Sequence, residues 1–213
     1  MIESMTGSTS SARAAGKNAR RRILKVLFAG VAAHLAPARA EDGDLEKLFA
    51  LFAAQGERRK AFVERRYSVL FRNPPESRGS LYFRPPAFLE RTVVSPRRET
   101  VRIDATNVTL TTEGDDGKPV ERKASLASIP QLASLVLTIR ATLAGDLATL
   151  RRMYYIDLKQ PLPHWRIQMK PVEEPVAGGV TAINMAGDGG DVQRLEFTET
   201  TGDRTEILLS PAT

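Results

Sequence analysis

Two short β-type runs joined at Pro85-Pro86 make up the segment GSLYFRPPAFLERTVVSP, residues 79–96. Large apolar and aromatic side chains are adjacent as well as alternating in both runs. Since successive side chains on a strand point to opposite faces, apolar groups project from both faces of the expected sheet. One face is predicted to cover a core, and the other is left available for an apolar ligand.

Further β-type runs flank this segment and are separated by short turn signals rich in Pro, Asn and Gly. Connections this short imply antiparallel neighbours. About ten strands are predicted, and an antiparallel sheet of that size must curl. The predicted strands are 61–71, 79–84, 88–94, 99–103, 108–112, 154–158, 165–170, 180–185, 192–198 and 205–209.

Three helices are predicted beside this sheet. The first begins after Asp44 as its N-cap and ends at Gly56, with one apolar stripe. The second has Pro130 in its first turn and ends at Gly145, and Asp146 caps a short third helix. The mid-chain helices are available to cover the open face of the sheet, so the fold class is α+β, mainly β, with an unclosed half-barrel covered by helices.

The N-terminus has the features of a secretory signal peptide. A basic stretch at 20–25 precedes a short apolar stretch at 26–35, and Ala38-Arg39-Ala40 fits a small-x-small cleavage site. An apolar stretch of about ten residues is too short to span a bilayer, which needs roughly twenty. We therefore expect a signal peptide with an N-terminal extension at 1–40, cleavage after Ala40, and a single periplasmic domain at 41–213. The start codon, Met1 or Met5, stays open.

The predicted removal of residues 1–40 changes the net charge from which function is inferred. The whole chain carries a net charge of +6, but residues 1–40 contain seven of the basic residues and one of the acidic ones, which leaves 24 of each sign in the remainder. With no basic excess in the mature chain, nucleic-acid binding is not expected. Cysteine is absent, which excludes disulfides, thiolate metal sites and a lipidated cysteine. No metal and no cofactor are predicted.

The collinear order of these features resembles the LolA-type periplasmic lipoprotein carriers, specifically their divergent LolA-related branch. The order is signal peptide, amphipathic helix, the 79–96 segment, apolar mid-chain helices, and a Trp165 to Pro171 motif. The resemblance covers roughly residues 44–210. It implies an unclosed eleven-strand half-barrel with a helical lid, whose hydrophobic cavity carries acyl chains across the periplasm. It also implies acylated or lipid-like cargo, an inner-membrane donor, an outer-membrane acceptor and a monomeric carrier.

One position departs from that family. Its members have an arginine before the proline that matches Pro86, and this arginine holds the lid through backbone carbonyls; here the position is Pro85. Arg91 is the nearest substitute, because period two places it on one face with Leu89 and Val93. Three interpretations of Arg91 are open: a lid latch, a head-group anchor, or a solvated edge residue.

Apolar residues from the first helix, the sheet and the second helix are the candidates for a ligand-binding cavity. Each of them is equally compatible with an ordinary core position. The candidates are Leu48, Phe52, Leu81, Phe83, Leu89, Val93, Leu132, Leu135, Val136 and Ile139.

Two other functions stay open beside a carrier. One is a non-transporting, lipid-sensing or scaffold module of an envelope pathway. The other is a periplasmic hydrolase, which would have to use His164, the one histidine after residue 40, without a G-x-S-x-G elbow to present a serine. We therefore expect no enzyme. The sequence leaves the cargo open between a lipoprotein, a glycolipid and a polyene lipid.

Overall fold

The computed structural model describes residues 40–114, 116–173 and 179–212. The chain divides into two units, residues 1–36 and 37–213, and every element below belongs to the second. The predicted signal peptide lies outside the described residues except for Ala40. None of the described helices is long and apolar enough to cross a membrane.

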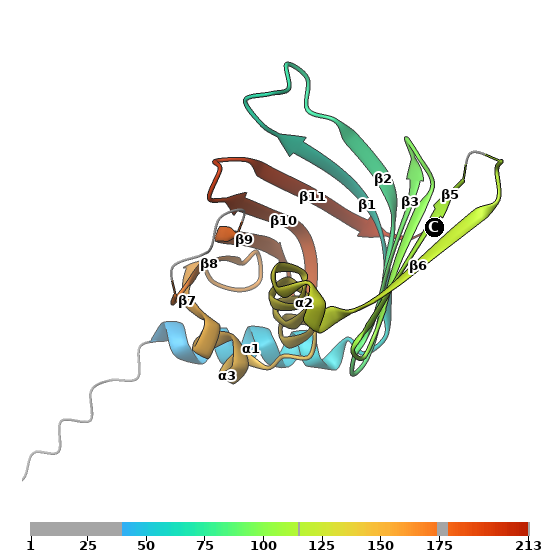
Figure 1. Ribbon diagram of the computed structural model, residues 1–213. Helices are drawn as coiled ribbons and strands as arrows, with labels where there is room; N and C mark the ends of the chain where they lie inside the picture. Colours follow the sequence, from blue (N-terminus) through green and yellow to red (C-terminus); the bar gives the residue numbers. More distant parts are fainter. Residues whose placement is uncertain (1–39, 115, 174–178, 213) are drawn as a thin grey trace, which may run out of the picture. The chain divides into compact units, whose positions relative to one another are not determined.

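A single antiparallel sheet of eleven strands curls through this unit (Figure 1). Its order is β6-β5-β4-β3-β2-β1-β11-β10-β9-β8-β7, so the first and last strands pair in the middle and β6 and β7 are the edges. The predicted mainly β, half-barrel fold is therefore confirmed. The strands are β1 (Arg58–Tyr67), β2 (Glu76–Arg84), β3 (Phe88–Ser95), β4 (Glu99–Asp104), β5 (Asn107–Glu113), β6 (Pro119–Ser125), β7 (Tyr154–Gln160), β8 (Arg166–Pro171), β9 (Val180–Asp188), β10 (Asp191–Glu199) and β11 (Arg204–Pro211).

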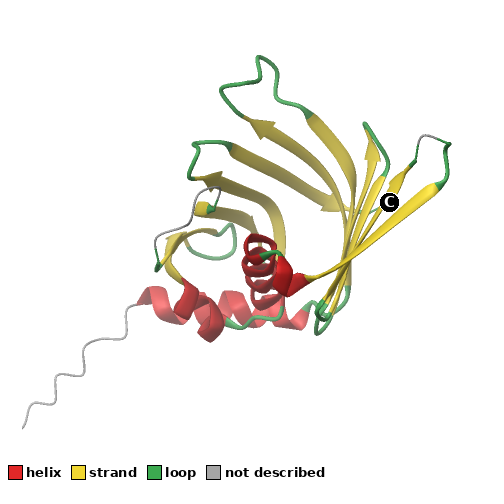
Figure 2. Cartoon of the chain, in the orientation of Figure 1, coloured by secondary structure: helices red, strands yellow, loops and turns green. Residues whose placement is uncertain are grey.

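Three α-helices and one short 3-10 helix accompany the sheet. They are α1 (Ala40–Ala54), η1 (Leu126–Ser128), α2 (Pro130–Leu143) and α3 (Leu147–Met153). Figure 2 shows α2 on the concave side of the sheet, with α1 and α3 across its lower end. Pro130 at the start of α2, Gly145 at positive φ after it, and Asp146 accepting from the Thr149 amide at 2.9 Å agree with the predicted helix ends.

The larger core cluster lies between α1, α3 and strands β7 to β10. Leu48, Phe49 and Phe52 follow helical spacing on one face of α1 and are fully buried there. Trp165 is fully buried against them, with its ring centroid 5.2 Å from that of Phe52 and its Nε1 donating to the Gly189 carbonyl at 2.9 Å. The Trp165 motif is therefore an anchor of the core.

A second, smaller core cluster lies between α2 and the other half of the sheet. It consists of Ile103 and Val108 from the sheet, Leu126 from η1, and Val136 from α2. Two separate cores leave the space between them open for the cavity described below.

The sequence predictions for α1, β1 and β6 differ from the structure. Asp44 does not cap α1, because the helix already begins at Ala40 and Asp44 pairs with Lys47 at 3.0 Å. Strand β1 ends at Tyr67 instead of residue 71, because a turn replaces the strand there. Strand β6 was missed, because all of its residues are exposed and it shows no apolar alternation. Its charged residues are typical of an edge strand that resists pairing with other chains.

Gly79, the first residue of segment 79–96, lies in β2 close to the backbone of β3. A Cβ at this position would lie 1.8 Å from the Thr92 carbonyl oxygen and 2.9 Å from the Phe62 ring. The strand register shifts between Arg78 and Gly79. Only glycine permits this approach, which fits the curl of the sheet at this point.

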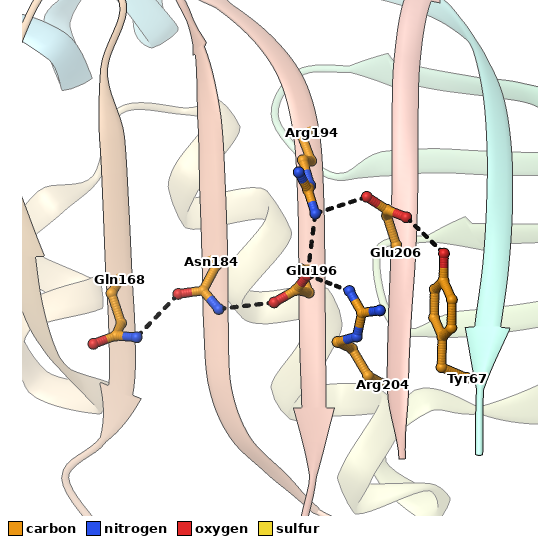
Figure 3. Close-up of polar contacts among 7 residues, drawn as sticks. All are labelled: Tyr67, Gln168, Asn184, Arg194, Glu196, Arg204 and Glu206. Carbon is orange, nitrogen blue, oxygen red and sulfur yellow. Dashed lines mark hydrogen bonds and ion pairs between the residues drawn. The ribbon is translucent and has the colours of Figure 1, made fainter. Parts of the chain in front are cut away.

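A ladder of polar side chains crosses five strands, from β8 to β1 (Figure 3). Strand alternation places it on the face opposite the cavity-lining residues of the same strands. Burial alone would raise the pKa of Glu196, but hydrogen bonds from Arg204 and Asn184 outweigh burial and lower it. The ladder runs through Gln168, Asn184, Glu196, Arg194, Arg204, Glu206 and Tyr67.

Candidate functional site

The concave face of the sheet and α2 enclose a cavity of about 440 Å³. Both halves of the sheet contribute to its wall, and α2 covers it. The wall is dominated by aliphatic and aromatic side chains. Its apolar members are Leu81, Phe83, Leu89, Val101, Ile103, Leu132, Leu135, Val136, Ile139, Leu143, Met169, Val180, Ile183, Met185, Val192, Leu195, Phe197, Ile207 and Leu209.

The polar groups of α2 at this wall are already satisfied within the protein. The Thr138 hydroxyl lies 2.9 Å from the Ser134 carbonyl and 2.8 Å from the Tyr154 hydroxyl, and the Thr142 hydroxyl donates to the Thr138 carbonyl at 2.8 Å. These hydroxyls therefore do not require a partner from a ligand, and the helix presents a wall that behaves as apolar.

Charged side chains interrupt the wall on β1, β3 and β10. Lys60 forms an ion pair with Asp191. Arg91 donates to Glu64 at 2.9 Å and lies 3.6 Å from Glu99. We call these five residues the charged belt; four of them line the cavity, and Glu99, on β4, lies outside the wall.

The Arg91 guanidinium also lies over the Phe62 ring, 5.0 Å from its centroid. Arg91 and Glu64 are both partly buried in this arrangement. Pairing with carboxylates and stacking on a ring together make this position tolerable for a cation beside an apolar cavity.

Arg58 links the ends of two helices to the sheet. From the first residue of β1, its Nη2 donates to the carbonyl of Phe52 in α1 at 2.6 Å and to that of Leu143 in α2 at 3.1 Å. Its Nε donates to the Gly56 carbonyl at 3.3 Å. Burial lowers the pKa of Arg58, and the charge of Asp191 opposes this shift.

Arg140 makes the corresponding link from α2 to the turns of the sheet. Its Nη1 donates to the Ala105 carbonyl at 2.9 Å, and its Nη2 donates to the Ala87 carbonyl. Its Nε is buried without a hydrogen-bond partner, and burial lowers the pKa of its guanidinium. Two arginines thus hold α2 against the sheet through backbone carbonyls.

The structure brings eight of the eleven predicted site residues together around the cavity: Leu81, Phe83, Leu89, Arg91, Leu132, Leu135, Val136 and Ile139. The other three lie in packed regions instead. Leu48 and Phe52 face Trp165 in the larger core, because the apolar stripe of α1 is turned toward β8 to β10, and Val93 is buried beside the cavity wall. Contact of any of them with a ligand stays a prediction.

His164 lies apart from this site. Its side chain is exposed, its Nδ1 is 3.5 Å from an Asp188 carboxylate oxygen, and it does not line the cavity. Within the described ranges, no three His, Asp or Glu side chains are grouped so that they could hold a metal ion.

The family model described as outer membrane lipoprotein carrier protein LolA-like matches residues 35–213. The chain belongs to this LolA-like family. No curated protein matches the sequence.

Several solved structures are similar to this LolA-like chain at low sequence identity. LprF from Mycobacterium bovis is 12% identical with a TM-score of 0.40, and the match covers 80% of this chain and 95% of the LprF chain. A LolA superfamily protein from Nitrosomonas europaea is 11% identical with a TM-score of 0.38, and the match covers 79% of this chain and 90% of that protein's chain. A chain of the MucA/MucB complex of Pseudomonas aeruginosa is 13% identical with a TM-score of 0.38, and the match covers 80% of this chain and 58% of that one.

Two arginines make the guanidinium hydrogen bonds between α2 and the sheet: Arg58 of β1 donates to the Leu143 carbonyl of α2, and Arg140 of α2 donates to carbonyls of two sheet turns. Arg91 pairs with Glu64 and Glu99 instead. Sequence analysis did not single out Arg58 or Arg140, because each is one arginine among many. Only the tertiary fold shows which of them reaches a carbonyl.

Proposed function

We propose that this chain is a periplasmic carrier that holds the acyl chains of a lipid or lipoprotein in the cavity beneath α2. The observation that carries the proposal is the mostly apolar cavity of about 440 Å³ between the sheet and α2. This volume falls within the range of about 300–1,000 Å³ typical of small-molecule sites. Burial of a methylene contributes about 0.8 kcal/mol, so a sixteen-carbon chain offers on the order of 10 kcal/mol before ordering costs.

The charged belt supports a cargo with a polar head. Arg91 lies among apolar wall residues, donates a hydrogen bond to Glu64 and forms a longer ion pair with Glu99 at 3.6 Å. A phosphate or carboxylate on the cargo would replace one of these carboxylates at the guanidinium. Arg91 is therefore assigned in this proposal as the head-group anchor.

Movement of α2 gives cargo its way in and out. The described side-chain hydrogen bonds between α2 and the rest of the protein involve Thr138, Arg140 and Leu143, which all lie in its C-terminal half. The proposal further assigns residues 41–213 to one exported lipid-binding domain, released by cleavage after Ala40. It acts as a monomer between an inner-membrane donor and an outer-membrane acceptor, and no step in it is catalytic.

Uptake of a fluorescent fatty acid by delipidated protein tests this proposal. Leu135 lines the cavity, and Leu137 on the same helix is 46% exposed and does not. We expect Leu135→Arg to weaken binding of the probe at least tenfold, because a charge would be buried against the acyl chain. The matched variant Leu137→Arg should bind as the wild type does. Equal binding by both variants, or no uptake by the wild type, would contradict the proposal.

A further inference from the structure

The connection between β1 and β2 carries three consecutive exposed apolar side chains. Val69 is 100% exposed, Leu70 is 83% exposed and Phe71 is 46% exposed. We call these three residues the apolar tip. The other large apolar side chains exposed among the described residues occur singly along the sequence. Scattered exposed apolar residues are ordinary, whereas a contiguous exposed group indicates an interaction surface.

The tip is held in a defined turn. The Phe71 amide donates to the Ser68 carbonyl at 3.1 Å, and the Leu70 amide to the Ser68 hydroxyl at 3.4 Å. The Arg66 amide donates to the Pro75 carbonyl at 3.1 Å and closes the base of the connection. The turn therefore presents the apolar side chains to solvent instead of folding them back onto the sheet.

Arginines surround the tip. Residues 65–78 contain four arginines and one glutamate, a net charge of +3, although the chain after residue 40 has equal numbers of basic and acidic residues. Arg65 and Arg78 share the single carboxylate of Glu76, at 2.9 and 2.7 Å. Arg66 forms ion pairs with Glu199 at the end of β10 and with Asp203, at 3.9 and 3.6 Å, and Arg72 is exposed next to Phe71.

The tip lies at the end of β1 opposite to Arg58, which contacts the helices. Ten residues of strand at about 3.3 Å each separate these ends by roughly 30 Å. Figure 1 shows the β1–β2 connection projecting beyond the neighbouring turns of the sheet. None of the three tip residues lines the cavity.

We propose that the apolar tip inserts into the interface of an anionic lipid bilayer, with Arg65, Arg66, Arg72 and Arg78 facing the head groups. A convex point with three outward apolar side chains gives a protein partner little surface to pack against. A bilayer needs only apolar groups to enter the acyl boundary and cations to meet anionic head groups. This docking goes beyond the carrier proposal and does not depend on what the cavity holds.

Co-flotation with vesicles tests the docking. The chain is exported with its own signal, purified, and mixed with vesicles of equal parts phosphatidylglycerol and phosphatidylcholine, or of phosphatidylcholine alone. We expect the Val69→Ser, Leu70→Ser, Phe71→Ser triple variant to lose at least tenfold in bound fraction on the anionic vesicles. The matched triple variant Val94→Ser, Val120→Ser, Leu208→Ser removes exposed apolar side chains elsewhere and should bind as the wild type does.

Fluorescence adds a second readout. A tryptophan at Phe71→Trp should shift its emission to the blue when anionic vesicles are added, whereas Tyr155→Trp, on edge strand β7, should not shift. Absence of binding by the wild type, or equal binding by the two triple variants, would overturn the proposal. Uptake of fatty acid by the tip variant should match the wild type, which separates this outcome from a failure of the carrier proposal or of folding.

Discussion

Arg58 and Arg140 show how a single guanidinium can join elements that are distant in sequence. Each has several donors in a fixed plane, which lets one side chain reach two backbone carbonyls at once. Arg140 leaves its buried Nε without a partner. An unsatisfied buried donor costs free energy, so the closed position of α2 is held but is not maximally stabilised. This balance agrees with the carrier proposal, in which α2 moves when cargo enters.

Glu196 gives a pH-dependent prediction at the same scale. Its pKa is lowered below the usual 4.5, so its contribution to stability is present above that pH and is lost as the pH falls through its folded value. We expect Glu196→Gln to reduce the free energy of unfolding by about 1 to 3 kcal/mol at neutral pH, because Arg204 and Asn184 lose a charged acceptor.

Denaturant titrations of both proteins at several pH values measure this effect. The difference in unfolding free energy between wild type and Glu196→Gln should shrink as the pH falls below about 4.5. A difference that stays constant from neutral to acidic pH would show that the charge of Glu196 does not stabilise the ladder.

At the scale of the element, the sequence of α2 predicts an apolar face but does not predict what that face covers. The spacing of Leu132, Leu135, Val136 and Ile139 predicted an apolar face, and the structure places that face over the cavity. The same spacing occurs in α1, where Leu48 and Phe52 lie in the core. Periodicity shows that a helix face is covered by something apolar, but it does not show whether protein atoms or a cavity lie beneath it.

Arg140→Met tests whether the polar contacts of α2 keep it closed. Methionine retains part of the apolar stem but donates to neither Ala87 nor Ala105, so we expect a loss of about 1 to 3 kcal/mol in unfolding free energy. Uptake of fluorescent fatty acid in stopped flow should be faster, because fewer bonds must break. Arg122→Met, on exposed strand β6, is the control and should change neither quantity. An unchanged uptake rate in Arg140→Met would show that the hydrogen bonds of Arg140 do not limit the movement of the helix.

At the scale of the whole molecule, the fold was more predictable than the site. Short connections and alternating runs indicate an antiparallel sheet, and most strands were found from these local signals. The pairing of β1 with β11 is a contact between the two ends of the described chain, and no local pattern specifies it. That pairing brings Ile207 and Leu209 to the cavity wall beside residues of β2 and β3. The contribution of β11 to the cavity wall could therefore be recognised only from the three-dimensional structure.

The charged belt also depends on contacts between residues that are distant in sequence. Lys60 and Asp191 are distant in sequence and form an ion pair across the sheet, and Arg91 meets Glu64 from a strand two positions away. Sequence reasoning placed Arg91 on the cavity face by period two but had no means of naming its partners. The distinction between a lid contact and a head-group contact depends on those partners.

Native mass spectrometry of the protein purified after export tests the central claim, that the cavity holds an acyl chain. We expect a bound lipid adduct on the wild type and on Leu137→Arg, and its loss from Leu135→Arg, because only Leu135 lines the cavity. The mass of the adduct would also identify the class of cargo. A wild-type protein that carries no lipid as purified, and takes up none after incubation with phospholipid or acylated peptide, would contradict the account.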